Sequence, residues 1–109
     1  MTCERWDVVA VPFPFSDRPG EKRRPALVLS NGRFNRGGHA VLAMITTLGK
    51  APWPGDTSID DLKAAGLPRP CMVRLKLFTL DARLIRKRLG TLAPNDARAV
   101  EGALRNFLP

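Results

Sequence analysis

The chain has 109 residues, which suits one domain with a modest core, and 44% of them are hydrophobic, which argues against a disordered protein. No apolar run approaches the roughly 18–20 residues of a membrane helix, and the first residues lack the apolar core of a secretion signal. The net charge of +8 favours a polyanionic partner. We therefore expect a single domain over residues 1–109, located in the cytoplasm.

The first half of the chain alternates short apolar segments with loops rich in glycine, proline and charge, which predicts strands joined by turns. Proline ends the first strand because it cannot donate to a ladder, whereas Pro25 is tolerated at the first position of the next. The apolar run that ends at Thr47 is nearly continuous, as expected of a strand covered on both faces. We predict strands at residues 7–11, 25–30, 40–47 and 57–59, separated by loops at 16–24, 31–38 (with Gly37-Gly38 suited to a hairpin) and 49–56.

The second half predicts further strands and a closing helix. Asp60 is suited to cap a short helix over 60–65, which Gly66 ends. Residues 71–77 alternate between apolar and polar or basic side chains, as in a half-exposed strand. A helical turn at 80–84 and a last strand within 85–92 follow.

The final segment has the spacing of an amphipathic helix. Val100, Leu104, Phe107 and Leu108 recur at helical intervals, and Pro94 suits the first turn. Many short strands followed by one helix predict an α+β fold, mostly β. We expect a small, strongly bent antiparallel sheet or partly open barrel packed on the terminal helix.

Two segments carry most of the basic residues. Residues 18–36 hold six cations against Glu21, and residues 69–90 hold seven against Asp81. Together they contain 13 of the 18 cations, a distribution typical of polyanion binders, although a basic solvated surface gives the same pattern.

Arginine and threonine stand at the ends of two predicted neighbouring strands. Three cations at 22–24 lead directly into the strand at 25–30, and the next strand ends at Thr46 and Thr47. A guanidinium fixed at a strand end is well placed to hold a phosphate. The two strand ends can therefore converge on one anion.

Neither a metal nor another cofactor is expected. Cys3 and Cys71 lack the spacing of a zinc site, and His39 is the one histidine. The acids are scattered, so the sequence offers no carboxylate cluster for two metal ions. Cys71 suits a small core thiol, and a disulfide to Cys3 is disfavoured in a reducing compartment.

Ordered blocks across nearly the whole sequence resemble the MazF/PemK family of toxin–antitoxin ribonucleases. The most specific block is Lys-Arg-Arg-Pro-Ala-Leu-Val-Leu-Ser at 22–30. The others, in family order, are Asp-Val-Val at 7–9, Phe-Pro-Phe-Ser at 13–16, Ile-Thr-Thr at 45–47, Ala-Gly-Leu at 65–67, Val-Arg at 73–74, Phe-Thr-Leu-Asp at 78–81 and Leu-Gly-Thr-Leu at 89–92.

This resemblance implies an SH3-like barrel of the CcdB/MazF type and a homodimer. It implies a sequence-specific endoribonuclease that cleaves single-stranded RNA through the 2′-OH, without a metal, and leaves a 2′,3′-cyclic phosphate. It also implies a cognate antitoxin whose acidic or disordered segment wraps the toxin and blocks the RNA groove.

The resemblance also suggests roles for individual residues. Arg24 is expected to be the central catalytic cation, and Thr46 a hydroxyl donor to a phosphate or leaving oxygen. Arg24 suits charge stabilisation and proton donation better than a base role, because a guanidinium stays protonated. Thr47 competes with Thr46, because neighbouring strand residues face opposite ways. RNA contacts are expected from Ser16, Arg18, Lys22, Arg23, Thr47, Arg74 and Lys76.

Two positions depart from the family pattern. Lys76 stands where one branch has an aspartate, so it cannot serve as a carboxylate base. Trp6 stands where members often have glycine, and we expect that exchange to be tolerated only if the backbone φ there is negative.

Other functions remain open from the sequence. Trp53 and Phe34 are candidates for stacking on unpaired bases, although Trp53 equally suits a cover over the core or a dimer contact. A non-catalytic gyrase poison of the CcdB type and a plain RNA- or DNA-binding module are the rival functions on this scaffold.

Overall fold

The computed structural model describes residues 2–12, 23–49 and 51–108. Its strands form one antiparallel sheet in the order β4-β5-β3-β2-β1-β6. The strands are β1 Asp7–Pro12, β2 Arg23–Val28, β3 His39–Thr47, β4 Thr57–Ser58, β5 Cys71–Asp81 and β6 Lys87–Thr91, and the helices are α1 Gly32–Asn35, α2 Leu62–Ala65 and α3 Pro94–Phe107.

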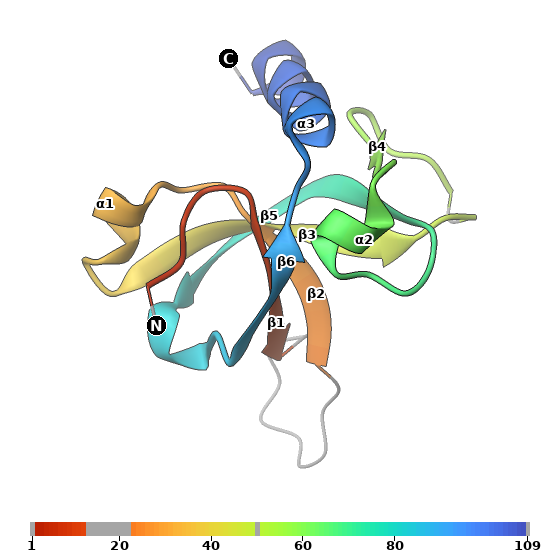
Figure 1. The fold of residues 1–109 in the computed structure, drawn as a ribbon. Coiled ribbons are helices and arrows are strands. Elements are labelled where there is room, and N and C mark those ends of the chain that lie inside the picture. Colours follow the sequence, from red (N-terminus) through yellow and green to blue (C-terminus); the bar gives the residue numbers. More distant parts are fainter. Residues whose placement is uncertain (1, 13–22, 50, 109) are drawn as a thin grey trace.

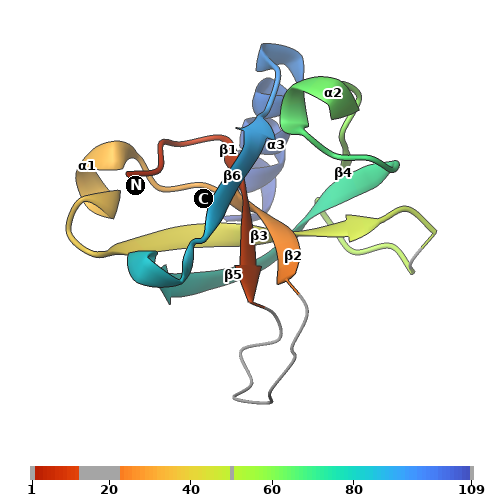
Figure 2. The same cartoon turned by 60° about the horizontal axis from the view of Figure 1, so that its bottom comes forward.

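The sheet is strongly bent. Figures 1 and 2 show β1, β2 and β6 crossing β3 and β5 steeply instead of running alongside them. The register shifts between Ala43 and Met44 of β3, where β5 carries the extra residues Leu75 and Lys76. Such bulges bend a strand and increase its twist. The curled half-barrel with a C-terminal helix confirms the predicted fold class.

Apolar side chains are buried on both faces of the sheet, because successive residues of a strand point to opposite faces. One cluster, covered by α2 and α3, contains Val8, Leu27, Ala43, Ile45, Ala65, Val73, Ala97 and Val100. The other lies inside the curl and contains Val9, Val11, Ala26, Val28, Leu42, Leu80 and Ile85. This arrangement confirms that the apolar run before Thr47 is covered on both faces.

Helix α3 begins and packs as its sequence predicts. Pro94 occupies the first turn, and Ala97 and Val100 bury the apolar face. Asp96 is only 3% exposed, and its carboxylate accepts hydrogen bonds from the backbone N–H groups of Asp60 and Asp61, each at 3.0 Å. Asp96 therefore ties α3 to the segment between β4 and α2.

The second strand begins earlier than predicted. Arg23 and Arg24 pair with Pro12 and Val11, so β2 starts at Arg23 and ends at Val28 instead of spanning 25–30. Charged residues predict a loop by local composition, but the neighbouring β1 supplies hydrogen-bonding partners that composition does not show.

Two short helical segments differ from the prediction. The loop predicted at 31–38 contains α1, because the Asn31 side chain accepts a hydrogen bond from the Phe34 N–H at 3.0 Å and caps the turn. In α2 the cap is Asp61 and not Asp60, and it accepts from the Ala64 N–H. Gly66 ends α2 with a left-handed φ of 72°, as predicted.

The fifth strand is longer than predicted. It continues to Asp81, because Leu80 pairs with Ala40 and is buried inside the curl. A single 3₁₀ turn at Ala82–Leu84 therefore replaces the helical turn predicted at 80–84. The last strand lies at Lys87–Thr91, within the predicted 85–92.

The two cysteines are free and buried on opposite sides of the sheet. Cys3 belongs to the cluster inside the curl and Cys71 to the cluster under α2 and α3. Burial raises the pKa of both thiols. The prediction of a core thiol at Cys71 is confirmed.

Trp6 has a φ of +77°, so the expectation of a negative φ at this position was wrong. Its N–H donates to the Val28 carbonyl at 2.8 Å, its carbonyl accepts from the Leu92 N–H at 3.0 Å, and the Arg5 guanidinium lies 4.5 Å from the ring centroid. The indole also packs against the cluster under α2 and α3. These contacts hold a large residue in a conformation that favours glycine.

We expect Trp6→Gly to be more stable than Trp6→Ala by about 1 kcal/mol. Both variants lose the indole contacts, and only alanine retains the strain of a positive φ. Urea unfolding of the two variants measures the difference. At Arg5, which is not among the positive-φ residues, glycine should give no advantage over alanine. If the two Trp6 variants were equally stable, the positive φ at this position would not strain a residue with a side chain.

Candidate active site

Arg24 and Thr46 lie at the open end of the curl, where two neighbouring strands leave the core. β2 and β3 pair at Ala26 with Met44, Leu27 with Ala43 and Val28 with Leu42. The ladder between the two strands ends at Ala26 and Met44, and Arg24 and Thr46 each lie two residues beyond that pair. Ala26 and Met44 lie opposite each other and share a face, and by alternation Arg24 and Thr46 leave their strands on that same face.

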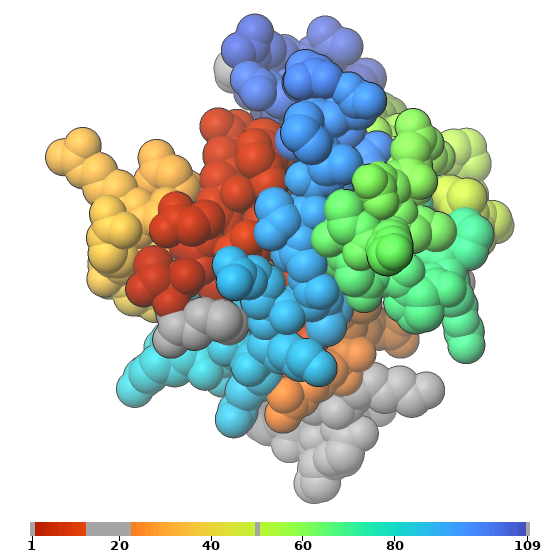
Figure 3. All heavy atoms as spheres, in the orientation of Figure 1, coloured from red at the N-terminus to blue at the C-terminus, as the bar shows by residue number. Residues whose placement is uncertain are grey.

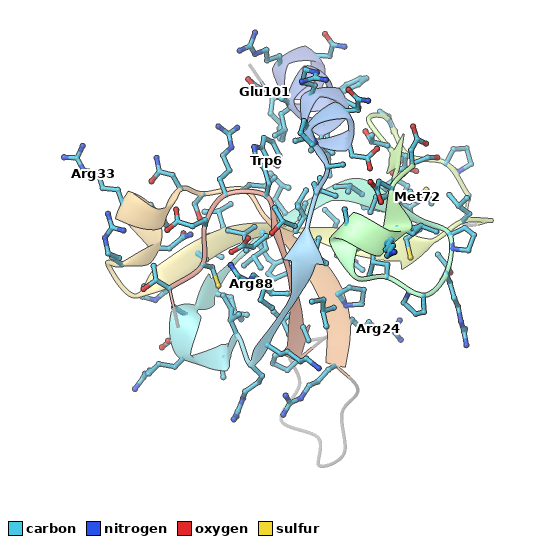
Figure 4. All side chains as sticks on the ribbon, in the orientation of Figure 1. Trp6, Arg24, Arg33, Met72, Arg88 and Glu101 are labelled. Atoms are coloured by element: carbon cyan, nitrogen blue, oxygen red, sulfur yellow. The ribbon has the colours of Figure 1, made fainter. Side chains whose placement is uncertain are left out.

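Arg24 is exposed, and no described residue forms an ion pair or hydrogen bond with its guanidinium. Figure 4 shows Arg24 projecting from β2, away from Trp6 and Arg88. Thr46 is half-buried, and its hydroxyl has no hydrogen-bond partner among the described residues. The structure thus presents a cation and a hydroxyl on one face with their bonding capacity unused within the described part of the chain.

Buried apolar residues neighbour both side chains in the sheet. Met72, opposite Thr46 on β5, is 7% exposed, and Ala26, two residues from Arg24 on β2, is 1% exposed.

Arg74 lies on this face but is already paired. Its Nε donates to Asp56 Oδ1 at 3.1 Å, and its Nη2 donates to Asp56 Oδ2 at 2.9 Å and to the Ala51 carbonyl at 2.7 Å. The side chains of Arg74 and Asp56 are each 12% exposed. This ion pair raises the pKa of Arg74 and lowers that of Asp56. Arg74 therefore holds the segment 51–56 to β5.

Lys76 lies in the bulge of β5 and is exposed. The bulge separates it from Arg74, which sits in the regular part of the ladder opposite Met44. The alternation that placed Arg74 and Lys76 on one polar face is therefore interrupted between them.

The remaining predicted residues divide into two groups. Arg23 and Thr47 are exposed and, by alternation, leave their strands on the face opposite to Arg24 and Thr46. Ser16, Arg18 and Lys22 lie outside the described residues. By alternation, Arg24 and Thr46 therefore share one face of their strands, and Arg23 and Thr47 leave on the other.

Asp56 and its contacts were missed by sequence reasoning. Asp56 sits in a loop that composition identifies only as a turn, and it is 18 residues from its partner Arg74. Its Oδ2 also accepts from the Trp53 N–H at 2.8 Å. The one local signal was an acid placed three residues after an aromatic residue, the spacing of a side-chain-closed turn.

Acid is expected to weaken the Asp56–Arg74 pair. The carboxyl pKa is lower in the folded protein than its ordinary value of about 3.9. Such a group stabilises the folded state above the unfolded pKa, and that stability is lost as the pH falls through the folded pKa. We expect Asp56→Asn to lower the free energy of unfolding at pH 7 and to reduce its further loss below about pH 4.

Urea unfolding at a series of pH values measures both effects. The Arg74→Gln background is the control, because the same Asp56→Asn substitution has no ion pair to remove there. An equal loss of stability in both backgrounds would show that Asp56 acts independently of Arg74.

No group of three or more histidine, cysteine or acidic side chains that could hold a metal ion occurs in residues 2–12, 23–49 and 51–108. Within the same residues, no helix is both long and apolar enough to span a membrane.

Comparisons with known proteins identify the family and the fold. The sequence model of a family described as PemK-like, MazF-like toxins of type II toxin–antitoxin systems matches residues 4–108. A search of curated proteins gave no match.

Solved structures of similar fold cover nearly the whole chain. MazF of Deinococcus radiodurans (Form-I) is 26% identical with a TM-score of 0.75, and covers 99% of this chain and 97% of its own. The MazE–MazF structure of D. radiodurans (Form-III) is 22% identical with a TM-score of 0.78, over 99% and 97%. A mycobacterial endoribonuclease in complex with its cognate antitoxin is 20% identical with a TM-score of 0.73, over 96% and 91%. The chain therefore belongs to the PemK-like, MazF-like toxins of type II toxin–antitoxin systems.

Proposed function

We propose that this toxin is an endoribonuclease that cleaves single-stranded RNA at short specific sequences, without a metal ion. The observation that carries the proposal is that Arg24 is exposed, with no partner for its guanidinium among the described residues, and that strand alternation puts Thr46 on the same face. The family match and the net charge of +8 support the same substrate class.

In this proposal the RNA supplies its own nucleophile. The ribose 2′-oxygen bonds to the adjacent phosphorus as its proton passes to a phosphate oxygen or a water molecule. The bond to the 5′-oxygen breaks, and that oxygen takes up a proton from a neighbouring donor. The products are a 2′,3′-cyclic phosphate and a 5′-hydroxyl. Negative charge grows on the nonbridging oxygens as the new bond forms, and a cation fixed beside them lowers the barrier.

Arg24 fits the stabilising role because its planar fork can donate to two phosphate oxygens at once. Thr46 fits the role of a hydroxyl donor to a nonbridging or leaving oxygen. Further RNA contacts are proposed for Ser16, Arg18, Lys22, Arg23, Thr47 and Lys76. Arg74 holds its neighbouring segment instead of offering a free cation.

The assembly is proposed on the same grounds. We propose that the 109-residue chain acts as one toxin domain and as a homodimer, and that a cognate antitoxin binds it through an acidic or disordered segment. The solved MazE–MazF complexes and the excess of cations in this chain support an acidic protein partner.

Incubating the purified chain with a broad pool of single-stranded RNA and EDTA tests the activity. We expect cleavage, with products that carry 2′,3′-cyclic phosphate and 5′-hydroxyl ends. A matched oligonucleotide with a 2′-deoxyribose at the cleaved nucleotide should stay intact. Sequencing the new 5′ ends reports the recognition motif.

If all RNA in the pool stayed intact, the proposal that the chain is an enzyme would be wrong. Inhibition of gyrase without RNA cleavage would then identify a CcdB-like poison. Affinity for RNA without cleavage would identify a binding module.

A further inference from the structure

Trp53 is held in place and yet remains exposed. Its indole is 42% exposed. Its backbone N–H donates to Asp56 Oδ2 at 2.8 Å, and its carbonyl accepts from the Asp56 N–H at 3.1 Å. The Arg74 guanidinium carbon lies 4.9 Å from the ring centroid. A side chain that is already ordered loses little conformational entropy when it binds a ligand.

The residue on which the indole stacks is a neighbour of Thr46. Thr46 pairs with Met72 and Met44 pairs with Arg74, in an unbroken register. Thr46 and Arg74 are therefore diagonal neighbours on one face, with Cα atoms about 7–8 Å apart. Trp53 thus contacts a side chain that leaves the sheet on the same face as Thr46.

The chemistry around Trp53 suits a base better than a phosphate. Asp56 neutralises Arg74, so the cation beneath the ring attracts an anion less strongly than an unpaired guanidinium would. What this spot offers to solvent is an aromatic surface, and unpaired bases stack on such surfaces in single-strand-binding proteins. Trp53 is also absent from both core clusters, so it does not serve as a core residue.

We propose that Trp53 is a stacking platform for an unpaired base of the RNA substrate, next to the cleaved linkage. Arg74 and Asp56 are positioning residues that hold the indole in place. This inference rests on the proposed function and adds to it a base contact that phosphate-gripping residues do not provide.

Intrinsic fluorescence reports directly on this contact, because the chain has two tryptophans, Trp6 and Trp53. The probe is a pool of random, fully 2′-O-methylated RNA, which resists cleavage and retains its bases. We expect it to quench the parent protein. Trp53→Phe, which leaves only Trp6, should lose the quenching and keep an affinity within a few-fold of the parent.

Removing the ring should weaken RNA binding selectively. Trp53→Ala is expected to reduce affinity for the same RNA pool about 5- to 150-fold, which corresponds to the loss of one stacked base. Binding of inorganic polyphosphate, which has no bases, should not change. Thermal unfolding of both Trp53 variants checks that they are folded.

The positioning role has a separate readout. Arg74→Met removes the ion pair and the cation–π contact, and should also weaken RNA binding with no effect on polyphosphate. Combining it with Trp53→Ala should give no further loss, because both substitutions remove the same platform. Additive losses would overturn the positioning role.

Phe34 provides a matched exposed aromatic control. It is 51% exposed on α1, which projects from the body of the molecule in Figure 3. It precedes β3, whose far end carries Thr46, and an extended strand of that length spans on the order of 25 Å. Phe34→Ala should therefore leave RNA affinity unchanged.

The outcomes separate the two proposals. If the parent binds RNA but Trp53→Ala binds it equally well and quenching persists in Trp53→Phe, the stacking platform is overturned and the nuclease proposal stands. If the parent shows no affinity for RNA, both proposals fail together. If the tryptophan fluorescence changed with protein concentration but not with added RNA, Trp53 would lie in a contact between copies of the chain. That result would overturn the stacking proposal.

Discussion

Replacing Arg24 with alanine is expected to reduce the rate of RNA cleavage about 10²- to 10³-fold. The loss follows from removing the exposed cation that, by strand alternation, leaves the sheet on the same face as Thr46. Affinity for uncleavable RNA should fall far less, because the charge on the phosphate oxygens grows only in the transition state. Single-turnover cleavage and equilibrium binding, measured on the same oligonucleotide, separate the two effects.

Lysine at position 24 is not expected to support the cleavage rate that arginine gives. A lysine ammonium is a point charge and cannot reproduce the two parallel hydrogen bonds of a guanidinium. Arg24→Lys should therefore cleave much more slowly than the parent while binding RNA nearly as well. Recovery of the full rate by lysine would show that position 24 needs only a positive charge.

Neighbouring positions provide the controls for this site. Arg23→Ala removes an equal charge from the opposite face of β2 and should raise KM with little effect on kcat. Thr46→Val, which keeps the side-chain shape, should slow cleavage, whereas Thr47→Val should not. The reverse order of the two threonine variants would assign the hydroxyl to Thr47.

Replacing Asp96 with alanine is expected to cost about 2–4 kcal/mol of the free energy of unfolding. The carboxylate is 3% exposed and accepts from the N–H groups of Asp60 and Asp61, so its removal leaves two backbone donors without their acceptor. Asp96 also lies in the first turn of α3, where a negative charge is favourable. Urea unfolding of the folded chain at neutral pH measures the loss.

Asp60 is the matched control for Asp96. Its backbone donates to Asp96, but its own side chain is exposed and forms no hydrogen bond among the described residues. Asp60→Ala should therefore change stability by less than about 0.5 kcal/mol. The loss of stability in Asp96→Asn should lie between those of Asp96→Ala and Asp60→Ala, because an amide keeps one acceptor oxygen. A stable Asp96→Ala variant would show that α3 is held by its apolar face alone.

Local sequence patterns predicted the strands and the closing helix well. They failed where pairing with a residue far away in the sequence determines the secondary structure. The alternation of 71–77 and the helical spacing of Val100 and Leu104 depend on residues close in sequence. Leu80, by contrast, looks helical in its local context and becomes a strand residue because Ala40 of β3 pairs with it. A sequence window contains no information about which strand lies alongside.

Trp6 shows the same limit at one residue. Its sequence neighbours give no reason for a positive φ, and tryptophan in place of the relatives' glycine led us to expect a negative one. Hydrogen bonds to Val28 and Leu92, on two other parts of the chain, impose the conformation.

The sequence by itself determined the mostly β fold, the family, and the positions of an arginine and a threonine at two strand ends. It did so because strand alternation, helical spacing and the 22–30 block are properties of adjacent residues. Only the tertiary structure showed that the charges of Arg24 and Arg74 have different surroundings. Folding brings Asp56 to Arg74 across 18 residues and leaves Arg24 exposed, with no acid among the described residues beside it. Which charge is neutralised depends on how the sheet bends and where its loops close, and these contacts form between residues far apart in the chain.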